Sequence, residues 1–182
     1  ETPRELLQAQ GINNEALPEI AYGRPDIKFK ENLSIIKSRL SPERKNFLNS
    51  IDNNEMGGDS LINEMYRILG TPQTSNTAIL PDNQKCFEIA DNILRTVIAS
   101  EGSGKTYHLI NSEFNTRNNH EYFSFEYNLQ KEGSIVPINQ HTISLITIKG
   151  DYLYTFTVTS PEGIWDNEKQ SLYKVAESFV VN

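Results

Sequence analysis

The stretch ASEGSGKT, from Ala99 to Thr106, is the part of the sequence that comes closest to a nucleotide-binding motif. It satisfies a relaxed Walker A pattern, with Ala99 where the first glycine usually stands. A phosphate-binding loop needs a strand before it and a helix after it, because the helix N-terminus holds the phosphates. Here the hydrophobic spacing predicts the reverse order, and no strand ending in a Walker B aspartate is evident. The pattern therefore favours a glycine-rich connection from a helix to a strand.

The three histidines, His108, His120 and His141, are the other candidates for chemistry. No two of them are spaced i, i+4 on a helix, which excludes a zincin-type metal site. His120 falls in a polar turn, and His108 lies on an alternating strand, where we expect a surface or half-buried ring. His141 begins a strand and with a nearby acid could bind a divalent cation, although a structural role is the favoured interpretation. Spacing reveals no Ser–His–Asp arrangement, and Cys86 lies on the apolar stripe of a predicted helix, as a buried structural thiol would.

Charge is distributed unevenly along the chain. The net charge of −7 argues against nucleic acid as the main partner. The segment from residue 24 to residue 45 has seven basic and three acidic residues, a net charge of +4, which leaves −11 for the rest. Such a segment could dock on an acidic protein surface or form a strand edge protected by solvated cations, and the sequence leaves both open. The basic residues are Arg24, Lys28, Lys30, Lys37, Arg39, Arg44 and Lys45.

The length of 182 residues suits one domain with a sizeable core, and no apolar run is long enough to span a bilayer. One cysteine excludes an intrachain disulfide. The chain begins at Glu1, without a methionine or a signal-like segment, so we expect a processed mature protein from which any targeting peptide has been removed. Residues 1–25 are expected to form an irregular arm. Residues 26–182 are expected to form one domain, with a long helical insertion at about 41–80.

Hydrophobic periodicity predicts five strands, together with helices that would pack on both faces of the sheet formed by these strands. The stretch from Thr142 to Ile148 is apolar on both faces, so it should be a central strand covered on both sides. A turn at Gly150 reverses the chain, and Asp166 or Asn167 should cap a last amphipathic helix. Antiparallel strands with helices on both faces give an α+β fold, an α-β-α sandwich with a central antiparallel sheet. The remaining strands are expected at 33–40, 106–114, 121–129 and 152–158, the last two helices at about 82–99 and 167–179, and a turn at 115–119.

An ordered set of short segments resembles the PsbP family of lumenal proteins of oxygenic photosynthesis. Together these segments extend over roughly residues 25–40 and 81–182. The connection from 41 to 80 is longer than in most members, and the usual first hairpin is not visible in residues 1–25. The segments are ENLSII at 31–36, FEIADNIL at 87–94, IASEGSG at 98–104, YFSFEY at 122–127, the stretch 141–154, PEGIW at 161–165 and VAESFV at 175–180.

This resemblance implies a PsbP/Mog1-like sandwich and a non-enzymatic protein of the chloroplast thylakoid lumen, peripheral to the membrane and not spanning it. It implies docking on the lumenal surface of the photosystem II core, beside other extrinsic subunits, where known members help retain the calcium and chloride of the oxygen-evolving complex. The alternatives are an assembly factor or a subunit of another thylakoid complex, photosystem I or NDH-type. The resemblance implies no tightly bound cofactor and no nucleic acid partner.

Some family members hold a divalent cation at a position that corresponds to His141, with an acid that corresponds to Glu162. The resemblance therefore implies a possible calcium, manganese or zinc ion at these two residues and, as a third alternative, a metal-binding lumenal protein. The seven basic residues of the segment 24–45 are expected to dock on an acidic partner.

Overall fold

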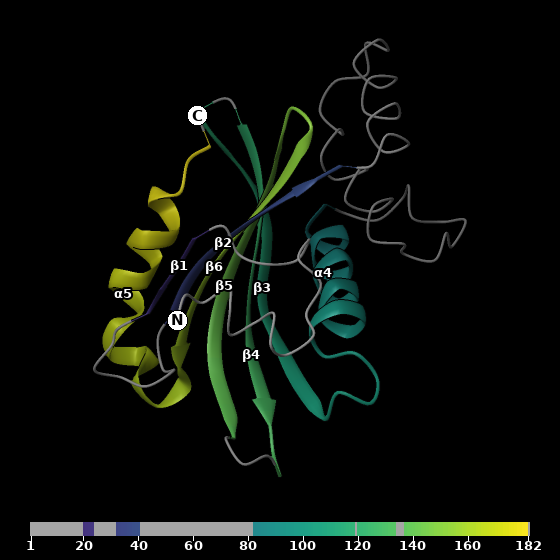
Figure 1. Cartoon of the computed structure of the whole chain (residues 1–182), viewed down its shortest axis with the longest axis vertical. Helices are drawn as coiled ribbons and strands as arrows, with labels where there is room; N and C mark the ends of the chain where they lie inside the picture. The colour runs from purple at the N-terminus through teal and green to yellow at the C-terminus, as the bar shows by residue number, and fades with distance from the viewer. Residues whose placement is uncertain (1–19, 24–31, 41–81, 119, 134–136, 182) are drawn as a thin grey trace.

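The computed structural model describes residues 20–23, 32–40, 82–118, 120–133 and 137–181. Six strands form one antiparallel sheet in the order β1-β2-β6-β5-β4-β3. Helices α4 and α5 lie on opposite faces of it (Figure 1). This confirms the predicted α+β sandwich. The strands are β1 (Ile20–Gly23), β2 (Asn32–Arg39), β3 (Lys105–Arg117), β4 (His120–Lys131), β5 (Ile138–Lys149) and β6 (Tyr152–Pro161), and the helices are α4 (Asp82–Ile93), its π-helical continuation η3 (Leu94–Ile98) and α5 (Glu162–Ser178).

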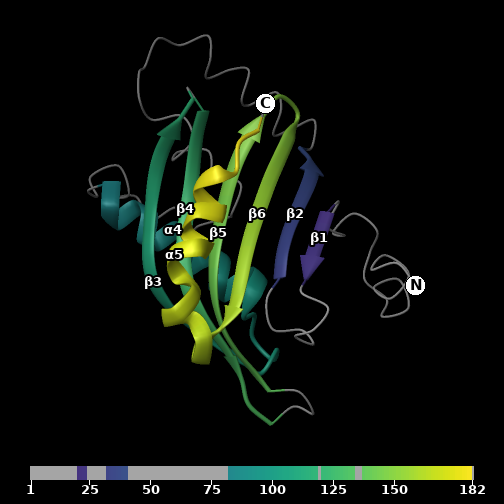
Figure 2. The same ribbon diagram turned by 90° about the vertical axis from the view of Figure 1, so that its left-hand side faces the viewer.

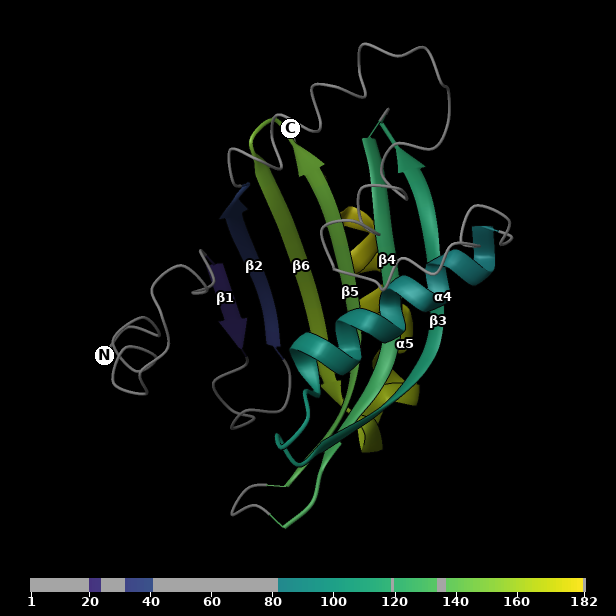
Figure 3. The same ribbon diagram turned by 90° about the vertical axis from the view of Figure 1, so that its right-hand side faces the viewer.

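Strand β5 lies inside the sheet, between β6 and β4, as its two apolar faces predicted. Ile143 and Leu145 pack under α5, whereas Ile146 belongs to the core under α4. Figure 2 shows α5 in front of the sheet, and Figure 3 shows α4 across the other face. The alternation of side chains along each strand therefore decides which of two separate cores a residue enters.

The core under α4 contains the aromatic row of β4 and the apolar stripe of the helix. Cys86 is 3% exposed, which confirms the predicted buried thiol, and the Ser112 hydroxyl donates a hydrogen bond of 3.0 Å to its carbonyl oxygen. The buried members of this core are Cys86, Ile89, Ala90, Ile93, Leu94, Phe123, Phe125, Tyr127, Leu129 and Ile146.

The Walker-like string is a connection from a helix to a strand, as predicted. Gly102 and Gly104 have φ angles of 79° and 67°, a left-handed backbone that glycine adopts without strain. Strand β3 then begins at Lys105, where a phosphate-binding loop would need a helix. The lysine side chain donates to the Ile98 carbonyl at 3.3 Å. The geometry of a P-loop is therefore absent from this part of the described chain.

Three predicted boundaries were wrong. The turn expected at 115–119 starts only after Arg117, because the polar residues at the end of β3 remain paired with β4. Helix α5 starts at Glu162 rather than near Asp166: Pro161 occupies the N-cap position without a side-chain hydrogen bond, and the acid in the first turn suits the helix dipole. Residues 20–23 of the arm expected to be irregular pair with β2. The expected insertion at 41–80 lies outside the described residues.

Strand β3 forms one edge of the sheet and contains an irregularity. Leu109 pairs with Tyr127 and Asn111 with Glu126, which leaves Ile110 as an extra residue that is 37% exposed. Such a bulge increases the local twist of an edge strand. Among the helices of the described chain, none is long and apolar enough to cross a membrane.

Candidate functional site

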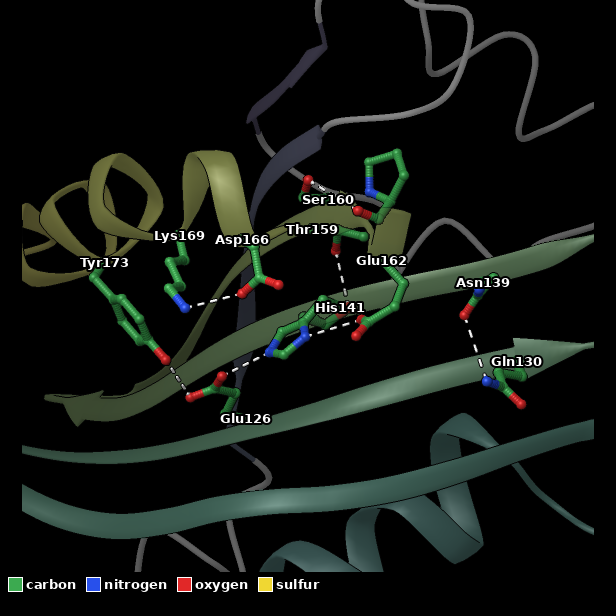
Figure 4. A network of polar contacts seen from close by, with 12 residues as sticks. Glu126, Gln130, Asn139, His141, Thr159, Ser160, Glu162, Asp166, Lys169 and Tyr173 are labelled. Carbon is green, nitrogen blue, oxygen red and sulfur yellow. Dashed lines mark hydrogen bonds and ion pairs between the residues drawn. The ribbon is translucent and has the colours of Figure 1, made fainter. Parts of the chain in front are cut away.

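His141, on β5, lies between two carboxylates. Its Nε2 atom is 2.6 Å from Oε1 of Glu126, and its Nδ1 atom is 3.0 Å from Oε2 of Glu162 (Figure 4). An ionised carboxylate can only accept a hydrogen bond. A ring that donates from both nitrogens would therefore satisfy both contacts at once. The His141 side chain is only 5% exposed, against 13% for Glu126 and 35% for Glu162.

The register of the sheet and the start of α5 bring these three side chains together. His141 pairs with Asn128 on β4 and with Ser160 on β6. Glu126 is two residues from Asn128 and so shares its face, opposite the aromatic row of β4. Glu162 follows the end of β6 and is the first residue of α5. The cluster thus forms where two strands and a helix N-terminus meet.

Two aromatic residues of α5 complete the cluster. The indole of Trp165 stacks on the imidazole of His141, with ring centroids 3.6 Å apart and an interplanar angle of 8°. Tyr173 meets the indole edge-on at 5.8 Å and donates its hydroxyl to Oε2 of Glu126 at 2.7 Å. A cation against an aromatic face is stabilised by the ring quadrupole. Helix α5 therefore contacts the sheet here through a charged and aromatic network.

The electrostatics of the cluster favour the ionised state of Glu126. Burial alone would raise the pKa of this carboxyl, but hydrogen bonds from His141 and Tyr173 outweigh burial and hold the pKa below its ordinary value. Burial, followed by the bond to Glu126, raises the pKa of the Tyr173 phenol, which therefore stays protonated as a donor. On the exposed side of α5, Lys169 donates to Asp166 at 2.9 Å and lowers the pKa of that carboxyl.

The two residues predicted to hold a cation, His141 and Glu162, do lie in contact. In the observed arrangement, however, a carboxylate oxygen lies against each ring nitrogen, and a metal ion could reach either nitrogen only by replacing that contact. Within the described residues no group of three or more histidine, cysteine, aspartate or glutamate side chains is placed to hold a metal ion. The cluster as it stands is a hydrogen-bonded ion cluster, and the cation stays a prediction.

Two members of the cluster, Glu126 and Tyr173, were missed by the sequence analysis. Glu126 lies within the strand predicted at 121–129, but alternation does not tell which residue lies across the sheet. The other two histidines stay apart from the cluster. His108 is exposed on β3, as expected for a surface ring, and His120 begins β4 instead of lying in a turn.

Two of the seven predicted docking residues, Lys37 and Arg39, lie on β2. The Lys37 ammonium lies over the ring of Tyr152, 4.2 Å from its centroid, and 5.7 Å from that of Tyr154. Arg39 is exposed. The other five, Arg24, Lys28, Lys30, Arg44 and Lys45, lie outside the described residues.

Comparison with known proteins gives a consistent set of relatives. The model of a family described as PsbP matches residues 24–181. CyanoP of Thermosynechococcus vestitus (strain NIES-2133 / IAM M-273 / BP-1) is 28% identical over 95 residues, which are 52% of this chain and 52% of that protein. The match therefore spans about half the length of this curated relative.

A solved structure of a family member shows the same fold. The solution structure of cyanobacterial PsbP (CyanoP) from Synechocystis sp. PCC 6803 superposes with a TM-score of 0.56 at 20% identity, covering 93% of this chain and 79% of that one. A crystal structure of PA94 from Pseudomonas aeruginosa, a protein of unknown function, gives a TM-score of 0.46 at 10% identity, with coverage of 90% and 82%.

Proposed function

The chain belongs to the PsbP family, and from this premise we propose that it is a non-catalytic extrinsic protein of photosystem II. It docks on the lumenal face of the complex, in the chloroplast thylakoid lumen, and stabilises the oxygen-evolving complex by helping to retain calcium and chloride. The observation that carries the proposal is the family match, which extends over residues 24–181.

The geometry of the site supports a role as a rigid cover. The reactive groups of the His141 cluster satisfy one another, since the imidazole contacts Glu126 and Glu162 and the Tyr173 phenol donates to Glu126. A general acid or base would need an open approach to a substrate. A network of this kind instead fixes α5 against the sheet. A rigid protein that occupies a lumenal surface can slow the escape of ions without performing any reaction.

The proposal is tested by reconstitution. Photosystem II particles stripped of extrinsic proteins are mixed with the purified protein, and oxygen evolution is measured as calcium and chloride are lowered. We expect the protein to bind and to reduce the concentrations of both ions needed for half-maximal activity. Failure to bind, or binding with an unchanged ion requirement, would refute the proposal. Recovery of the protein only with incomplete complexes would indicate an assembly factor, and recovery with photosystem I or an NDH-type complex would indicate another partner.

A divalent cation at His141 and Glu162 is a second proposal, supported by the contact of 3.0 Å between Nδ1 and Oε2. Glu126 contacts Nε2 on the other side of the ring and therefore does not share this position. Imidazole and carboxylate ligands suit zinc and manganese, whereas calcium prefers oxygen alone. The chemistry of the donor set therefore favours manganese or zinc over calcium.

A further inference from the structure

The end of the sheet formed by the β5–β6 hairpin and β2 carries two cross-strand rows of cations and tyrosines. In the first row, Tyr152 of β6 pairs with Arg39 of β2 on one side and with Lys149 of β5 on the other. In the second row, Tyr154 pairs with Lys37 and with Thr147. The register therefore fixes these side chains beside one another, although they come from distant parts of the sequence.

All of these side chains lie on the face of the sheet that α5 covers further along. Ile35 and Phe156 belong to the core under α5, and alternation places positions two and four residues away on the same face. The helix ends at Ser178, and the chain end lies beside the hairpin end of the sheet (Figure 2). Arg39 is exposed, and Lys37, Lys149, Tyr152 and Tyr154 are half-buried. We call these five residues the cation–tyrosine patch.

The positive charge of the patch is not neutralised within the described part of the chain. The ion pairs found there involve His141 and Lys169, and none involves a cation of the patch. The Lys37 ammonium instead lies over the two tyrosine rings, and Lys149 donates to the Val181 carbonyl at 3.4 Å. Three cations are thus gathered on a protein whose net charge is −7. Such a local excess of charge selects an anionic partner.

We propose that the cation–tyrosine patch binds an extended acidic segment of a partner protein, a proposal that rests on the docking function proposed above. Lys37 and Arg39 are two residues apart on one strand, so their side chains repeat at about 6.6 to 6.8 Å. An extended segment has the same repeat, and its carboxylates at alternate residues match the two cations. Lys149 lies two strand spacings to the side of this line, about 10 Å, and adds positive charge beside it.

The tyrosines, and the lack of large exposed aliphatic side chains among the described residues of this patch, favour a protein segment over a membrane surface. Tyrosine rings offer rigid amphipathic contact area at low entropic cost, which suits a peptide backbone. A surface that inserts into lipid needs exposed apolar side chains beside its cations. The large exposed hydrophobic residues of the described chain, Phe87, Val97, Ile110 and Tyr173, all lie outside the patch.

The test is a titration of the purified full chain with a dye-labelled dodecapeptide of alternating glutamate and serine, followed by fluorescence anisotropy at low salt. The control peptide alternates glutamine and serine. The patch variant is Lys37→Gln, Arg39→Gln and Lys149→Gln. The matched variant, Arg95→Gln, Lys131→Gln and Lys174→Gln, removes the same charge from other surfaces of the described chain.

We expect the wild type to bind the acidic peptide, the patch variant to bind at least about tenfold more weakly, and the matched variant to change by less than about twofold. The single change Arg39→Gln, at an exposed side chain, should weaken binding about threefold and remains informative if the triple variant does not fold. Equal weakening by both triple variants, or no binding of the acidic peptide by the wild type, would overturn the proposal.

Two further arms separate the alternatives. Vesicles with and without phosphatidylglycerol test whether the patch binds an anionic membrane surface instead. If the patch variant loses vesicle binding but keeps peptide binding, the choice of a protein segment is overturned. Photosystem II particles test the link to the proposed function. If the patch variant binds these particles as the wild type does, the proposed role of the patch is refuted and the proposed function stands. If the wild type binds the acidic peptide but not photosystem II, the proposed function is refuted, whereas binding of an acidic segment by the patch is supported.

Discussion

The imidazole of His141 lies flat against the indole of Trp165, with ring centroids 3.6 Å apart and planes 8° apart. One residue belongs to the central strand β5 and the other to the first turn of α5, so the stack joins the helix to the sheet. The two carboxylates that bind the ring nitrogens come from β4 and from the same helix. Four residues from three elements therefore meet at one buried imidazole.

Replacing His141 with glutamine should destabilise the protein markedly. The change removes the buried imidazole between Glu126 and Glu162 and leaves the mostly buried Glu126 carboxylate without this partner. We expect the free energy of unfolding to fall by about 3 kcal/mol, the lower end of the cost of breaking a buried pair. Urea denaturation followed by Trp165 emission measures the change, since the chain has one tryptophan. The matched change His108→Gln, at an exposed position, should cost less than about 0.5 kcal/mol, and equal losses would refute the role of His141.

Stability should fall on acidification partly through Glu126. Its pKa is lower in the folded protein than the ordinary 4.5, so the ionised carboxyl stabilises the fold above that value. This contribution is lost as the pH falls from 4.5 through the folded pKa. In Glu126→Gln the free energy of unfolding should be lower near neutral pH and should change less between about pH 5 and pH 3. Denaturation at a series of pH values measures this, and parallel curves for both proteins would contradict it.

A divalent cation at His141 and Glu162 must compete with protons for the ring nitrogen. Calorimetry with manganese or zinc, repeated in buffers of different ionisation enthalpy, should therefore show proton release and an affinity that falls as the pH is lowered. His141→Ala should abolish both signals. Equal weak binding by the wild type and the variant would remove the cation from this site and leave the hydrogen-bonded cluster as its only role.

Docking through basic residues predicts that salt releases the protein from its membrane partner. Because a higher ionic strength screens charges at an exposed interface, a wash with about 1 M NaCl should detach the protein from thylakoid membranes. Release is quantified by immunoblotting of the pellet and the wash. A wash with an isosmotic neutral solute serves as the control. Full retention in molar NaCl would refute the electrostatic part of the docking mechanism.

The sequence predicted those features of the fold that depend on local periodicity. Two apolar faces identified β5 as a central strand, and the apolar stripe that contains Cys86 identified α4. The start of α5 was misplaced because Pro161 and Gly163 are typical of a loop, whereas proline also suits the first residues of a helix. The edge strand β1 was missed because only its pairing with β2 defines it.

The candidate site was predicted in part. The pairing of His141 with Glu162 came from the family resemblance. Glu126 and Tyr173 could not be found from periodicity, because their approach depends on the register of β4 against β5 and on the position of α5. The same is true of Lys149, which joins Lys37 and Arg39 only through β6. Contacts across a sheet are set by tertiary pairing, and a single sequence carries little information about them.

The extra residue Ile110 in β3 also bears on how the protein behaves at high concentration. An outermost strand exposes free backbone amides and carbonyls along one side, and a straight one can recruit the same strand of a second copy, which begins the growth of fibres. The irregularity between Leu109 and Asn111 interrupts that row near its middle. We therefore expect that deleting Ile110 would make the outer strand regular and the protein more prone to polymerise.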